Sequence, residues 1–152
     1  MNTLPTLLFL VVAVQGQHRI ESTYDRFTDK TTVRVYYMQV GERQQAINLD
    51  ALYTYDGQTL NSPPPTITLR FISGGAVSFG SETPRLYVLY DGKRLTVESD
   101  ARSDNGAAIY RVPLEQIETF LKAKQLEMRV GTVEINLSDD TLKTLREFIP
   151  RH

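Results

Sequence analysis

Hydrophobic and polar residues alternate along much of the chain. Between residues 66 and 72, Ile67, Leu69 and Phe71 fall on one face of an extended segment, and Thr and Arg residues lie between them. A period of two predicts β-strands with one buried face. Two more such faces are Val33, Val35 and Tyr37, and Ile47, Leu49, Ala51, Tyr53 and Tyr55. Leu86–Tyr90 is apolar on both faces, which predicts a strand in the middle of a sheet.

The motif Tyr-Asp-Gly-x-x-Leu occurs at both 55–60 and 90–95. Asp91-Gly92 lies between two β-prone runs and predicts a two-residue hairpin, because Gly tolerates positive φ and Asp bonds its own backbone. Asp56-Gly57 leads instead into Pro63-Pro64-Pro65, a stiff connector that cannot donate to a sheet ladder. The repeat therefore indicates turn chemistry and not a duplicated ligand-binding motif.

A second hairpin is predicted at Val130-Gly131-Thr132-Val133, since Gly at the first loop position suits a type II′ turn. This hairpin would place Arg129 opposite Glu134 and Met128 opposite Ile135. The alternative is one continuous strand with a bulge at Gly131.

Two later segments have the spacing of amphipathic helices. The first runs from 113 to 124 and places Pro113 at its first position, where proline is well tolerated. The second begins after Ser138, a favourable N-cap residue, and ends before Pro150. The expected apolar stripes are Leu114, Ile117 and Leu121 in the first helix, and Leu142, Leu145, Phe148 and Ile149 in the second.

Because each helix has one apolar side, both must pack against a sheet. We therefore predict an α+β protein, with a mainly antiparallel β-sheet or sandwich and two short amphipathic helices in its C-terminal half. We expect residues 31–152 to form a single β-rich domain, preceded by an N-terminal extension at 17–30. The Gly- and Ser-containing segments 73–84 and 98–106 predict surface loops.

Residues 1–16 have the organisation of a signal peptide, although no basic residue precedes the apolar run. The run 4–14 is broken only by Pro5 and Thr6, and it is too short to span a bilayer. Val14 and Gly16 suit a signal peptidase that cuts before Gln17. The alternative is a buried N-terminal strand. We expect an extracytoplasmic mature chain, periplasmic or secreted, without a transmembrane segment.

The composition of the chain argues against several kinds of partner, catalytic site and cofactor. The net charge is -1 without a basic cluster, so we expect no nucleic-acid partner. The chain has no cysteine, which excludes disulfides and thiolate catalysis. Its two histidines, His18 and His152, lie near the expected mature ends, where neither is well placed to act as a general base. No phosphate-binding loop, nucleophile elbow or dinucleotide motif is present, so no cofactor is expected.

Asp100, Asp104 and Asn105 are candidate calcium ligands, because their oxygens surround a Gly-containing segment. The spacing lacks the alternating acids and terminal Glu of an EF-hand, and Arg102 would oppose a cation. A solvated turn is therefore favoured.

Four strand tyrosines form a candidate partner surface: Tyr53, Tyr55, Tyr87 and Tyr90. Tyrosine on an exposed sheet face suits stacking on sugars or contact with a partner protein. The absence of Trp weakens the sugar interpretation. The alternative places these rings at the edge of the core with the hydroxyl in water.

The segment Tyr24-Asp-Arg-Phe-Thr-Asp-Lys-Thr-Thr-Val33 resembles the start of uncharacterised bacterial exported proteins with the motif Tyr-Asp-x-Phe-x-Asp-x-Thr-x-Val. The segment 128–146 is similar to their C-terminal end. The resemblance implies export and fold class, and it implies no site residues.

These observations favour an exported, non-catalytic β-rich domain that binds an unknown protein or envelope component, or that supports a cell-envelope assembly. The alternative is a hydrolase of the cell envelope that uses carboxylates and tyrosine in a cleft.

Overall fold

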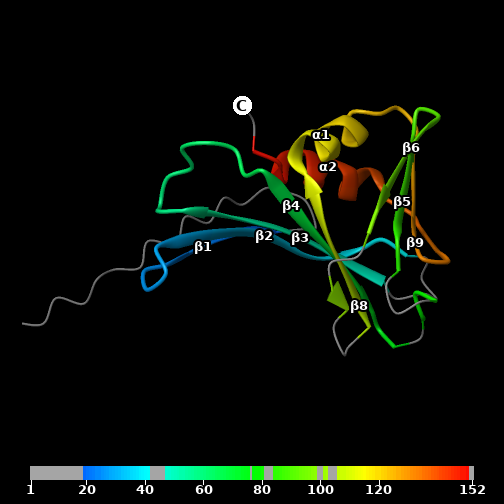
Figure 1. The fold of residues 1–152 in the computed structure, drawn as a ribbon, viewed down its shortest axis with the longest axis horizontal. Helices are drawn as coiled ribbons and strands as arrows, with labels where there is room; N and C mark the ends of the chain where they lie inside the picture. The colour runs from blue at the N-terminus through cyan, green and yellow to red at the C-terminus, as the bar shows by residue number, and fades with distance from the viewer. Residues whose placement is uncertain are drawn as a thin grey trace, which may run out of the picture.

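A computed structural model describes residues 19–41, 47–75, 77–80, 84–98, 101–102 and 106–150. These residues form two antiparallel sheets and the helices α1 (Leu114–Leu121) and α2 (Asp139–Phe148) (Figure 1). Sheet A has the spatial order β1 (Ile20–Asp25), β2 (Lys30–Gln39), β3 (Ile47–Asp56), β4 (Thr66–Ser73), β8 (Ala107–Pro113), β7 (Ala101–Arg102). Sheet B has the order β10 (Val133–Ile135), β9 (Leu126–Val130), β5 (Leu86–Tyr90), β6 (Lys93–Val97). The predicted α+β class is confirmed.

The alternating faces expected on β3 and β4 are buried as predicted. Ile67, Leu69 and Phe71 point into the core, and the residues between them are only partly buried. Strand β2 departs from its prediction because the register with β3 shifts between Val35 and Met38. A bulge of this kind changes which positions face inward. Met38 therefore lies in the core with Val35, which the uniform alternation did not predict.

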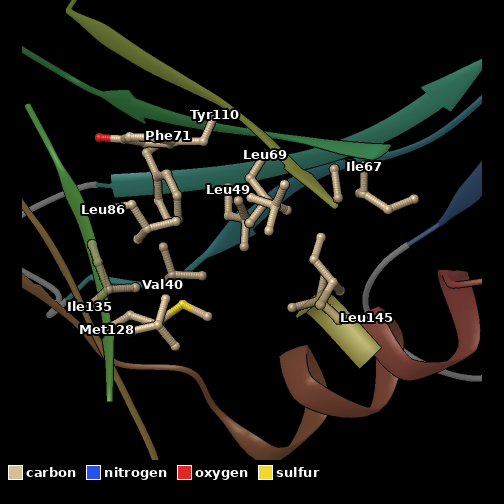
Figure 2. Close-up of a cluster of buried hydrophobic side chains, with 14 of the residues drawn as sticks. Val40, Leu49, Ile67, Leu69, Phe71, Leu86, Tyr110, Met128, Ile135 and Leu145 are labelled. Carbon is tan, nitrogen blue, oxygen red and sulfur yellow. The ribbon is translucent and has the colours of Figure 1, made fainter. Parts of the chain in front are cut away.

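One hydrophobic core joins both sheets and both helices. Two of its members, Phe71 of sheet A and Val40, which directly follows β2, lie near Leu86, Met128 and Ile135 of sheet B (Figure 2). Away from this contact, the helices cover the same face of sheet A. Around one small void of about 10 Å³, strand residues meet helix residues: Leu49, Ile67 and Leu69 with Ile117, Phe120, Leu121, Leu145 and Phe148.

Both predicted hairpin turns are confirmed. Asp91 and Gly92 have φ values of 46° and 77°, as a type I′ turn requires, and Tyr90 pairs with Lys93. The Asp91 carboxylate also accepts hydrogen bonds from the amides of Lys124 and Gln125 at 3.1 and 3.0 Å. This turn therefore fixes the chain between α1 and β9 as well as the β5–β6 hairpin.

At the β9–β10 hairpin, Arg129 pairs with Glu134 and Met128 with Ile135, so the bulge alternative is wrong. Gly131 has a φ of 58° at the first loop position. A Cβ atom built on Gly131 would lie 1.9 Å from the carbonyl oxygen of Phe79. Glycine is required here by both the backbone conformation and the close approach of another segment.

The helices form where predicted, with small shifts at their ends. Pro113 is the N-cap residue of α1 and not its first helical residue. The Ser138 hydroxyl accepts a hydrogen bond from the Thr141 amide at 3.1 Å, which confirms the N-cap of α2. The buried side of α2 is rotated relative to the expected stripe, since Thr141 is buried and Leu142 only half-buried.

Two segments expected to be peripheral take part in the fold. Phe79, in the predicted surface loop 73–84, is only 1% exposed, because the loop turns this ring into the core. In the second predicted loop, Ala101–Arg102 pairs with β8 as strand β7. Residues Ile20–Asp25, from the expected N-terminal extension, form β1 and pair with β2 along their whole length.

Candidate functional site

The solvent side of sheet B carries an unusual mixture of side chains. Tyr87 pairs with Thr96 and Arg129, and Leu89 pairs with Arg94 and Glu127. Directly paired residues of an antiparallel sheet lie on the same face. Together with Glu134, which pairs with Arg129, these residues define what we call the outer face of sheet B: Tyr87, Leu89, Arg94, Thr96, Glu127, Arg129 and Glu134.

The opposite side of the same strands is part of the core. Leu86, Val88, Met128 and Val130 are all 5% exposed or less. Strand β5 lies between β9 and β6, as its apolar sequence predicted, yet only one of its faces is buried. Leu89 is 36% exposed, so an aliphatic side chain of the central strand β5 lies at the surface.

The outer face of sheet B lines a hollow of about 730 Å³, which is continued by Asn136 and Leu137 beyond β10. The Arg129 guanidinium lies 4.8 Å from the centre of the Tyr87 ring. This distance is within the range of a cation–π interaction, which holds both side chains in place. The hollow thus combines an ordered aromatic ring and an exposed leucine with two arginines and two glutamates.

The acidic residues of the hollow lie at its surface. Glu127 and Glu134 are both exposed. Within the described ranges, no group of three or more His, Cys, Asp or Glu residues is placed to hold a metal ion.

The four tyrosines proposed from the sequence do not form one surface. Tyr87 is the one that belongs to the outer face of sheet B. Tyr90 lies on the core side of β5 and is partly buried. Tyr53 is 8% exposed and packs against Phe148 with ring centres 5.1 Å apart, and burial raises the pKa of Tyr53. Tyr55 follows Tyr53 on β3, with ring centres 6.4 Å apart.

Several predicted features lie outside the described residues. They are the signal peptide 1–16, the calcium candidates Asp100, Asp104 and Asn105, and the histidines His18 and His152.

A buried charge cluster on sheet A was not predicted. On the side of sheet A away from the helices, Asp50 of β3 accepts hydrogen bonds from Arg34 of β2 and Arg70 of β4, both at 2.6 Å. The Asp50 side chain is 0% exposed, and the arginines are 22% and 32% exposed. Charged residues at outward-facing strand positions are normally expected to be exposed to solvent. The sequence signal that could have indicated this cluster is that such residues occur on three consecutive strands. The cluster ties those strands together and belongs to the framework.

The turn between β1 and β2 displays an exposed aromatic ring. Phe27 is 85% exposed, with the Arg26 guanidinium 4.9 Å from its ring centre. The Asp25 carboxylate accepts hydrogen bonds from the Phe27 amide and the Thr28 hydroxyl, both at 2.9 Å, and these bonds lower the pKa of Asp25. The Tyr24 hydroxyl donates to Asp29 at 2.9 Å. The Tyr-Asp-x-Phe-x-Asp residues thus build an ordered turn.

Comparisons with protein-family models, with curated proteins and with solved structures give no match to this chain. Neither helix in the described part of the chain has the length and apolar character needed to cross a membrane.

Proposed function

We propose that the protein is an exported, non-catalytic binding domain, which holds a protein partner of the cell envelope on the outer face of sheet B. One observation carries this proposal: a hollow of about 730 Å³ is built on a rigid sheet from Tyr87, Leu89, Arg129 and neighbouring charged residues.

The chemistry of this hollow favours a protein partner. Tyrosine and arginine are enriched at the energetic centres of protein interfaces. Tyr87 and Arg129 are adjacent here and oriented by their mutual contact. Because Arg94 and Arg129 are balanced by Glu127 and Glu134, the hollow does not select a strongly charged ligand such as a polyanion.

The alternative of a carboxylate-based hydrolase has less support. Such an enzyme needs two carboxyl groups across a cleft, one of them with a raised pKa. The acidic residues that line the hollow, Glu127 and Glu134, are exposed strand residues.

Capture from an envelope extract tests the binding surface. Leu89→Arg introduces a large charge at the centre of the hollow, whereas Thr54→Arg introduces the same charge at an exposed position of sheet A. We expect a specific partner to be captured by the wild-type chain and by Thr54→Arg, and lost with Leu89→Arg. A partner retained equally by both variants would contradict this location.

Export is tested separately by the mass of the protein purified from cells. Removal of residues 1–16 should give a chain that begins at Gln17. A purified chain that retains Met1 would contradict export. The capture experiment would still test the location of the binding surface, because it does not depend on removal of residues 1–16.

A further inference from the structure

The described part of the two sheets presents four edge strands, and they are not equivalent. Strands β7 and β10 have only two and three residues. Strand β6 begins with Lys93 and Arg94. Short length and basic residues are the usual protections of an edge strand against pairing with another chain.

Strand β1 is the least protected of the four. It has six residues, contains neither proline nor a basic residue, and pairs with β2 without a bulge. Its charged residues are the two acids Glu21 and Asp25. Figure 1 shows the β1–β2 hairpin extending away from sheet B, on the left of the view. Alternate backbone amide and carbonyl groups of an edge strand point away from its neighbour, and β2 is the one described strand that pairs with β1, so these groups have no partner strand among the described residues.

The side chains of β1 are complementary to those of a second, antiparallel β1. Pairing across a two-fold axis at Ser22 places Ile20 opposite the partner's Tyr24, and Arg19 opposite the partner's Asp25. An aliphatic–aromatic pair and an opposite-charge pair each stabilise neighbouring strands, and each occurs twice by symmetry. In the single chain, Arg19 forms an exposed ion pair with Glu21 at 3.4 Å, and pairing would exchange Glu21 for the partner's Asp25. Asp25 accepts two hydrogen bonds in its turn, and a carboxylate has about four acceptor positions, so it retains capacity for Arg19.

The neighbouring registers are disfavoured by charge. Directly paired residues of two neighbouring strands lie on the same face of the sheet, so the two-fold axis must pass through a residue and not between residues. Moving the axis to the next residue changes the pairing partner of every residue by two positions. An axis at Glu21 places Glu21 opposite itself in the partner. An axis at Thr23 places Glu21 opposite the partner's Asp25. Like charges directly opposite one another destabilise a pair of strands, so the axis at Ser22 is selected.

We propose that β1 is a homodimerisation edge, at which a second copy of this chain pairs antiparallel with Ser22 on the two-fold axis. The six-stranded sheet A of each copy then continues into that of the other. This interface is distinct from the outer face of sheet B, which stays accessible in the dimer.

Crosslinking at the axis tests the register directly, because the chain contains no cysteine. In Ser22→Cys, the two new side chains lie opposite each other with Cα atoms about 4.5–5.5 Å apart. This separation lies within the range that a disulfide spans. Thr96→Cys is the matched control, since Thr96 is an exposed residue of the protected edge strand β6. We expect oxidation to give a disulfide-linked dimer with Ser22→Cys and little or none with Thr96→Cys.

Sedimentation of the unmodified chain provides the second measurement. We expect a reversible, concentration-dependent dimer, and we expect Ser22→Lys to be monomeric over the same concentrations because two ammonium groups would meet at the axis. Ser22 is exposed, so an unchanged circular-dichroism spectrum should accompany the loss of the dimer.

Three results would overturn the proposal: a wild-type chain that is monomeric throughout, a dimer that persists in Ser22→Lys, or equal crosslinking of Ser22→Cys and Thr96→Cys. Ser22→Lys leaves the outer face of sheet B intact, so capture of an envelope partner by this variant separates the two proposals.

Discussion

The hydroxyl group of Tyr110, on β8 of sheet A, donates a hydrogen bond of 2.8 Å to the carbonyl oxygen of Pro84, which lies just before β5 of sheet B. Tyr110 is 0% exposed, and burial raises the pKa of its hydroxyl, so the group keeps its proton and remains a donor. The ring also packs edge-on against Phe71 at 5.9 Å between centres. One side chain therefore fixes the point at which the chain enters the second sheet.

Removing this hydroxyl tests its contribution. Tyr110→Phe leaves the buried Pro84 carbonyl without its donor, and we expect the free energy of unfolding to fall by about 1–3 kcal/mol. Urea denaturation followed by fluorescence or circular dichroism measures the change. Tyr53→Phe is the matched control, since no described residue bonds the Tyr53 hydroxyl, and it should cost less than about 0.5 kcal/mol. Equal effects of the two substitutions would contradict this role of the hydrogen bond.

A second prediction concerns the close approach at Gly131. A Cβ atom there would lie 1.9 Å from the Phe79 carbonyl oxygen, and the φ of 58° also disfavours alanine. We expect Gly131→Ala to reduce the free energy of unfolding by about 3 kcal/mol or more, from backbone strain and steric overlap together.

Gly57→Ala is the control for this substitution. Gly57 has a φ of 74° but no atom within 4 Å of a built Cβ, so only the backbone cost of about 1–2 kcal/mol applies. If Gly57→Ala were as damaging as Gly131→Ala, the contact with Phe79 would not be the cause. Thermal or chemical denaturation of both variants gives the comparison.

The buried carboxylate of Asp50 gives a third prediction. Asp50→Ala leaves Arg34 and Arg70 facing each other without the shared acceptor, and we expect a loss of about 3 kcal/mol or more. Replacing all three residues by apolar ones of similar size, as Arg34→Met, Asp50→Leu and Arg70→Met, should restore most of the stability. A triple variant as unstable as Asp50→Ala would show that the charge imbalance is not responsible.

The turn at Asp25 has a defined pH dependence. Hydrogen bonds from the Phe27 amide and the Thr28 hydroxyl lower the pKa of Asp25 in the folded chain, relative to about 3.9 in the unfolded chain. The ionised carboxylate therefore stabilises the turn above about pH 4, and this contribution is lost as the pH falls through the lowered folded pKa.

An NMR titration of the Asp25 carboxyl group measures this directly. We expect a midpoint below about 3.9. Thr28→Val removes the second donor and should move the midpoint upward, although not fully, because the Phe27 amide remains. A wild-type midpoint at or above the unfolded value would exclude the role of these hydrogen bonds.

Local sequence signals predicted the elements and turns well. Gly131 at the first loop position was enough to predict the pairing of Arg129 with Glu134, because two-residue loops fix the register of their strands. Ser138 similarly located the start of α2, since its hydroxyl satisfies an amide that the helix leaves free.

Features that depend on distant segments were not predictable in the same way. The bulge after Val35 interrupts the period of two, and nothing in the local pattern marks it. Phe79 lies in a loop-like sequence, and its burial depends on a gap formed by other elements. Tyr87 lies on an outer face and Tyr53 in the core. This difference depends on which helix or sheet covers each strand. Two tyrosines with similar local sequences therefore have different environments.

We propose above that the outer face of sheet B receives a protein partner. Site-specific photocrosslinking in intact cells tests it most directly, with a photoreactive amino acid in place of Leu89 and, as the control, in place of Thr54 on sheet A. We predict one discrete crosslinked species from position 89 and none of that mass from position 54. No adduct at position 89, or the same adducts at both positions, would contradict the claim.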